Sequence, residues 1–64
     1  MPKKRKATEQ DLANIVAEWA VREIHRNDNT RKAFRSLSPE VQGQIHGWAA
    51  DERQRRADGI TITD

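Results

Sequence analysis

Apolar residues recur at helical spacing along two long segments of the chain. Within residues 8–26 and again within residues 38–59, they fall at intervals of three and four, which places them on one side of a helix. The two stripes are expected to pack against each other as the main core of the protein. Their members are Leu12, Ile15, Val16 and Trp19 in the first segment, and Val41, Ile45 and Trp48 in the second.

Capping residues mark where both helices begin and where the second one ends. Thr8 suits the N-cap of the first helix, and Asp11 stands at the position that completes a shortened capping box. Ser38 suits the N-cap of the second, with Pro39 at the first helical position. Gly59 can adopt the left-handed conformation that follows a helix. The two helices are therefore predicted over residues 8–26 and 38–59.

The connector between the helices contains a third, shorter helix. The sequence NDNT over residues 27–30 consists of turn formers, which should end the first helix. Thr30 is then expected to cap a short helix in which Phe34 and Leu37 face the core. Pro39 disfavours helical geometry in the residue before it, so this helix should stop before Ser38.

These elements predict an all-α fold, a small three-helix domain with two long antiparallel helices and a short one between them. The chain has 64 residues and no cysteine, so one small core without disulfides must hold it together. We expect a flexible basic arm over residues 1–7, the helical domain over 8–59 and an extended tail over 60–64. The tail sequence ITIT has strand-like alternation but finds no second strand pattern with which to pair.

The first helix carries more apolar surface than one neighbour can cover, which favours a protein-protein interface. Its apolar arc extends past the core stripe, and the end of the last helix mixes charges with that stripe. Glu18 and Arg22 lie on the polar side and are expected to form a solvated pair. The predicted interface, with another protein or with a second copy in a homodimer, comprises Val21, Ile24, Glu52, Arg55 and Arg56.

Basic residues support an alternative function, a DNA-binding regulator. The net charge is only +2, and a cluster near the N-terminus accounts for more than all of it. This cluster, PKKRK, resembles a short nuclear localisation signal and could also enter a minor groove. Residues 30–46 could form a helix-turn-helix-like element. The candidate nucleic-acid contacts are Lys3, Lys4, Arg5, Lys6, Arg31, Lys32, Arg35, Gln42 and Gln44.

Catalytic, metal and membrane functions find little support in the residues. The only imidazoles, His25 and His46, stand on different helices and in no metal-binding spacing. We therefore expect no enzyme activity, no cofactor and no metal. No apolar run approaches the roughly 20 residues of a membrane span, so we expect a cytoplasmic protein, or a nuclear one in a eukaryotic host that uses PKKRK. The preferred hypothesis is a small helical interaction or regulatory module.

Overall fold

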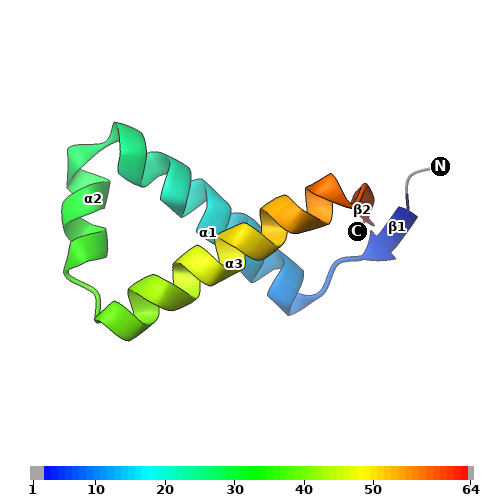
Figure 1. Ribbon diagram of the computed structural model, residues 1–64, viewed down its shortest axis with the longest axis horizontal. Helices are drawn as coiled ribbons and strands as arrows, with labels where there is room; N and C mark the ends of the chain where they lie inside the picture. Colours follow the sequence, from blue (N-terminus) through cyan, green and yellow to red (C-terminus); the bar gives the residue numbers. More distant parts are fainter. Residues whose placement is uncertain (1–2, 64) are drawn as a thin grey trace.

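The computed structural model describes residues 3–63 as three helices closed at one end by a two-stranded sheet (Figure 1). The order along the chain is β1 (Lys3–Lys6), α1 (Glu9–Arg26), α2 (Asp28–Arg35), α3 (Pro39–Ala57) and β2 (Ile60–Thr63). Helices α1 and α3 run in opposite directions along the molecule, α2 joins them at one end, and the two strands lie at the other. The molecule is elongated, with extents of 41 × 22 × 18 Å.

The caps predicted from the sequence define the ends of the long helices. The Thr8 hydroxyl accepts a hydrogen bond from the Asp11 amide at 3.1 Å, and the Asp11 carboxylate accepts one from the Thr8 amide at 3.0 Å. This reciprocal pair is a complete capping box. Ser38 caps α3 through the Val41 amide, and Gly59 follows α3 with a φ of 75°. A residue with a Cβ would be strained at that angle.

Helix α2 begins three residues earlier than the sequence suggested. The Asn27 side chain accepts hydrogen bonds from the amides of Asn29 and Thr30, at 2.9 and 3.3 Å, so Asn27 caps the helix in place of Thr30. The Phe34 ring packs edge-to-face on His46 of α3, with centroids 5.3 Å apart. Leu37 remains 39% exposed, so the expectation that it faces the core was wrong.

The sheet corrects the all-α assignment and the expectation of a flexible arm for residues 3–6. Strands β1 and β2 pair in parallel, with Lys3 opposite Ile60 and Lys6 opposite Thr63. The pairing continues one residue further, where the Ala7 amide donates to the Thr63 carbonyl at 3.0 Å. Backbone groups make these bonds, and for this reason a run of four cations can serve as a strand without any apolar alternation.

The core of the molecule is small and differs from the core predicted from the sequence. The buried apolar residues are Ala17, Val21 and Ala49, with Ile45 and Trp48 packed against them. Small side chains at the contact allow α1 and α3 to approach closely. The predicted core residues Ile15, Phe34, Ile45 and Trp48 are partly buried, whereas the predicted core residues Leu12, Val16, Trp19, Leu37 and Val41 are exposed.

Candidate functional site

An uncovered apolar surface runs along one side of α1. Leu12 is 56% exposed, Val16 57% and Trp19 62%, although their spacing is that of residues a helix normally buries. We call these three residues the α1 stripe. Their exposure follows from the way α3 docks on the neighbouring edge of α1, through Ala17 and Val21. The stripe is thus the part of the wide apolar arc that α3 leaves uncovered.

A groove of about 390 Å³ adjoins the α1 stripe, between α1 and α3. All the side chains that line this apolar groove are hydrophobic, so its attraction for a ligand is purely that of apolar burial. Trp19 does not belong to the lining, but it follows Val16, which does, by three residues on the same face of α1. The lining residues are Leu12, Ala13, Val16, Ala17, Ala20, Ile45 and Trp48.

The interface predicted from the sequence lies mostly inside the molecule. Val21 belongs to the core, Glu52 is buried and the Arg55 side chain is only 14% exposed. Ile24 is partly buried, and its carbonyl accepts a hydrogen bond from Arg31. Arg56 is the one exposed member, and its side chain contacts the Glu18 carboxylate. Helix α3 covers the Val21 side of the arc and leaves the Leu12 side open.

Two buried carboxylates between α1 and α3 are matched by arginines. Glu52 accepts two hydrogen bonds from Arg55, at 2.7 and 2.6 Å, and its carboxylate lies 3.7 Å from Nε of Arg56. Glu18, which the pattern had placed in solvent, is buried and contacts both Arg22, at 2.9 Å, and Arg56. Hydrogen bonding to Glu52 raises the pKa of Arg55 above its ordinary value. These cations offset the free energy that is lost when the two carboxylates are removed from water.

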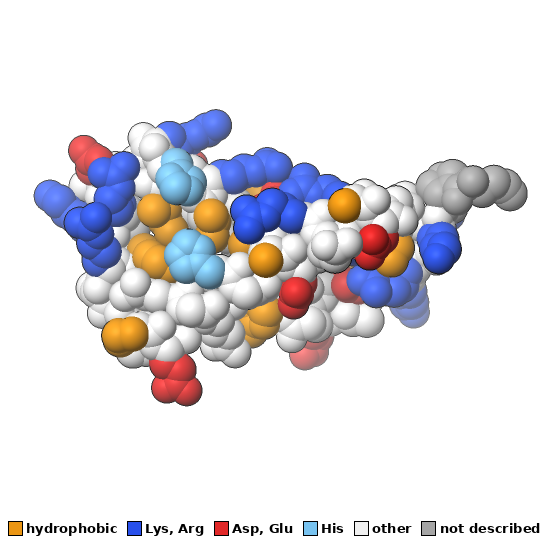
Figure 2. Space-filling model, in the orientation of Figure 1, with side chains coloured by type: hydrophobic (Ala, Val, Ile, Leu, Met, Phe, Trp, Pro, Cys, Tyr) orange, Lys and Arg blue, Asp and Glu red, His pale blue; other side chains and the backbone are white. Residues whose placement is uncertain are grey.

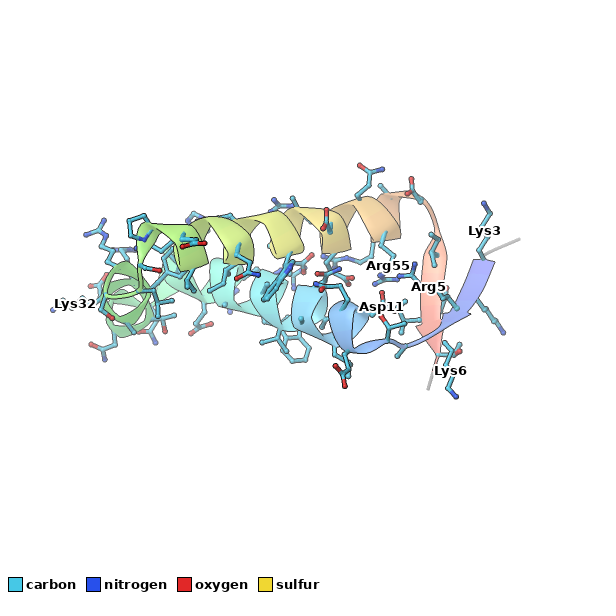
Figure 3. The ribbon with its side chains drawn as sticks, turned by 90° about the horizontal axis from the view of Figure 1, so that it is seen from below. Lys3, Arg5, Lys6, Asp11, Lys32 and Arg55 are labelled. Carbon is cyan, nitrogen blue, oxygen red and sulfur yellow. The ribbon has the colours of Figure 1, made fainter. Side chains whose placement is uncertain are left out.

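A second set of polar contacts holds the sheet against the helices (Figure 3). Arg5 of β1 forms an ion pair with Asp11 of α1, and Arg55 of α3 donates to the carbonyl of Ile60 in β2. The backbone amide of Thr8, its hydroxyl and the Arg5 guanidinium together hold the pKa of Asp11 below its ordinary value. Arg5 and Arg55 are thus structural, and both strands are anchored through an arginine.

The candidate nucleic-acid residues do not form one surface. Lys3, Lys6 and Arg5 lie at the strand end, and Lys32 lies at the opposite end with α2 (Figure 3). The space-filling view shows the Lys and Arg side chains spread over the α2 end and along one edge of the helices (Figure 2). The predicted contacts therefore divide into a β1 group, Lys3, Lys4, Arg5 and Lys6, and an α2 group, Arg31, Lys32 and Arg35.

The glutamines expected to read DNA have different surroundings. Gln42 donates to the carbonyls of Leu37 and Arg35, at 2.8 and 3.4 Å, and so satisfies the C-terminal end of α2. Gln44 is exposed. Arg31 is also engaged, with the Asp28 carboxylate at 2.8 Å. Of the α2 group, Lys32 and Arg35 are the exposed members.

Within residues 3–63, no three His, Cys, Asp or Glu side chains gather into a candidate metal site. In the same described part of the chain, every helix is too short or too polar to cross a membrane. We therefore take the apolar groove and the α1 stripe as the candidate functional site, because contiguous exposed apolar surface typically marks a binding site. Comparison with known proteins found no matching family model, no matching curated protein and no matching solved structure.

Proposed function

We propose that the protein is a small non-enzymatic interaction or regulatory module, and that it binds a protein partner through the α1 stripe and the apolar groove. The observation that supports this most directly is the exposure of three large apolar side chains in one row on α1. Contiguous exposed apolar surface on a soluble protein typically marks a binding site. We place this function in the cytoplasm, or in the nucleus of a eukaryotic host that uses PKKRK.

The chemistry of the surface suits a protein helix or another apolar protein surface as partner. Trp19 is the residue type most often found at energetic hot spots, where a large ring enters a desolvated pocket. In the same way, the apolar groove offers a pocket for a large side chain of the partner, with Ile45 and Trp48 on its α3 side. A charged ligand would find no counterpart in this lining, because every lining side chain is hydrophobic.

Site-specific photo-crosslinking tests this function. The full chain is prepared with the photoreactive residue benzoylphenylalanine in place of Leu12, inside the stripe, and separately in place of Ala50, which is exposed on α3 outside the groove. Irradiation is carried out on the purified protein and in expressing cells of the source organism. We expect protein adducts from position 12 and few from position 50. Absence of any protein adduct at position 12 in both settings would refute the proposal.

DNA binding is the second candidate function, and the exposed cations of β1 and α2 favour it. Lys3, Lys4 and Lys6 are exposed on a strand whose backbone is held by pairing. Binding through these side chains therefore does not have to order a flexible arm, and the entropic cost of binding is lower. Phosphate contacts of this kind make affinity fall steeply with salt. Because the β1 and α2 groups lie at opposite ends, Lys4→Glu with Lys6→Glu and Lys32→Glu with Arg35→Glu separate their roles.

The assay for this second function is binding to mixed-sequence duplex DNA over a series of salt concentrations. If DNA is the ligand, one of the two double variants should lose most of the affinity and lower the slope of log affinity against log salt by about 2, one unit for each lost phosphate contact. Equal binding by both variants and the unmodified chain would exclude the two groups as the binding surface. No binding even at low salt would exclude DNA.

A further inference from the structure

We propose that the partner of the α1 stripe is a second copy of this chain, in a two-fold symmetric dimer whose α1 helices pack antiparallel and cross near Val16. This inference rests on the proposed function, since it names the occupant of the same surface. It is argued from three properties of the described residues: the incomplete core, the order of large and small residues on α1, and the area of the exposed surface.

The first argument is that one copy leaves its largest apolar side chains outside its core. Among residues 3–63, none of the large side chains is fully buried, and the buried apolar set consists of two alanines and a valine. A chain of 64 residues without cysteines has neither disulfides nor a large core to stabilise it. Association is the usual remaining way for such a chain to bury apolar surface. The α1 stripe has the spacing of core residues, and a dimer would make it core.

The second argument is that α1 is complementary to itself. A two-fold axis at Val16 brings each residue level with the one equally far from position 16 on the other helix. On α1, Leu12 and Trp19 lie on one side of Val16, and Ala13 and Ala20 lie on the other. The axis keeps the two sides apart, so Trp19 lies beside Leu12 of the second copy, and Ala13 lies beside Ala20. Both alanines line the apolar groove. The large side chains of the two copies thus meet along one edge of the contact, and the alanines meet along the other, where their small size lets the two backbones approach closely.

The third argument concerns area. A tryptophan that is 62% exposed leaves about 150 Å² of side-chain surface in solvent. Together with Leu12, Val16 and the open parts of the groove, each copy offers on the order of 400 Å² of apolar surface. Two copies would bury roughly 800 Å² of apolar surface, and the flanking polar residues of α1 bring the contact to the roughly 1,000 Å² that a specific protein interface needs. We therefore expect a dimer of moderate affinity.

The same geometry has an unfavourable feature that makes the orientation testable. The axis at Val16 brings Glu9 of each copy near Glu23 of the other, at the two ends of the interface. Like charges in such positions weaken a helix pair, and an opposite pair strengthens it. Glu23→Lys should therefore tighten an antiparallel dimer several-fold. In a parallel dimer, position 23 faces position 23, so the substitution exchanges one pair of like charges for another and the variant should associate about as tightly as the unmodified chain.

Sedimentation equilibrium and thermal unfolding of the full chain, from about 1 μM to 1 mM, test the dimer itself. The unmodified chain should reach the mass of a dimer, and its Tm should rise with concentration. Val16→Glu and Val16→Lys should each weaken association by a factor of at least about 100, because both place like charges at the symmetry axis. Ala50→Glu adds the same charge at an exposed site outside the groove and should associate normally.

Mixing the two Val16 variants keeps the test decisive even if either one alone is poorly folded. An equimolar mixture places a glutamate opposite a lysine, and it should regain helical circular dichroism and the dimer mass. A monomer mass for the unmodified chain throughout the concentration range would overturn the proposed dimer. So would normal association of both Val16 variants.

Photo-crosslinking at position 12 separates failure of this inference from failure of the proposed function. A covalent dimer in the purified protein supports the second copy as partner. Adducts that form only in cells, and only with a different protein, would overturn the dimer while leaving the interaction function intact. Absence of any adduct would overturn both.

Discussion

Replacement of Arg55 by methionine examines how α1, α3 and the sheet are held together. Arg55 gives Glu52 two hydrogen bonds, at 2.7 and 2.6 Å, and donates a third to the carbonyl of Ile60 in β2. The Glu52 side chain is 6% exposed, so in the variant its charge stays largely out of water without its main partner. Methionine keeps the apolar stem of the arginine, and the loss therefore reports mainly on the charged head group.

The size of the effect follows from this geometry. Removing one member of a buried ion pair typically costs about 3 to 5 kcal/mol. Two observations lower that figure here, since Arg55 retains 14% exposure and Nε of Arg56 lies 3.7 Å from the same carboxylate. We expect the free energy of unfolding to fall by about 2 to 3 kcal/mol, most of what a core of this size provides. Glu52→Met together with Arg55→Met should recover much of the loss, because no unpaired charge is then buried.

Urea unfolding followed by far-UV circular dichroism, at one fixed protein concentration, measures this difference. Arg53→Met is the matched control, because Arg53 is an exposed arginine on the same helix and should change stability by no more than about 0.5 kcal/mol. If Arg55→Met and Arg53→Met unfold at the same urea concentration, the Glu52 carboxylate is solvated and the reasoning fails.

Three further predictions concern acid stability, glycine positions and Trp19. Because the folded-state pKa of Asp11 lies below its ordinary value of 3.8, its contribution to stability is complete above that pH and is lost as the pH falls through the folded pKa. In urea unfolding measured at a series of pH values, Asp11→Asn should therefore reduce the loss of stability at acid pH. An unchanged loss at acid pH would contradict the role of Asp11. Gly43→Ala should raise stability by about 0.5 to 1 kcal/mol, since Gly43 is inside α3 with open space around it. Gly59→Ala should lower stability by about 1 kcal/mol, because Gly59 has a positive φ. Tm shifts of the same sign for the two variants in thermal unfolding would be evidence against this difference. Trp19→Ala should lower the free energy of unfolding by less than about 1 kcal/mol in the dilute monomer, where Trp19 is 62% exposed, and by more at concentrations that favour the dimer. A loss of about 3 kcal/mol at every concentration would show that the ring is buried within one copy.

Local signals in the sequence were sufficient to locate the long helices. Thr8, Ser38 and Gly59 act through hydrogen bonds and backbone angles that involve only a few neighbouring residues, so their effect is readable without the fold. The antiparallel pairing of the long helices followed from the short connector between them. The predicted start of α2 was wrong, because NDNT contains several residues that can cap a helix, and Asn27 acts in place of Thr30.

The candidate site could not be located from periodicity, because the apolar arc of α1 is wider than one neighbour. Both edges of that arc, one with Leu12 and Trp19 and the other with Val21 and Ile24, have helical spacing. Ala17 and Ala49 decide between them, since their small side chains permit the closest approach of the two backbones. The width of the arc correctly indicated a surplus face, but it did not indicate which edge would be exposed.

The partners of charged and extended segments were decided by tertiary structure alone. The pattern placed Glu18 in solvent, yet the approach of α3 buries it beside Arg56. The segment Lys3–Lys6 has no strand pattern of its own, and it becomes a strand because α1 and α3 bring it beside Ile60–Thr63. Capping and helical periodicity depend on neighbours along the chain, and a sequence displays those directly. Which faces meet, and which ends pair, depends on how closely distant backbones can approach, and only the assembled fold determines that.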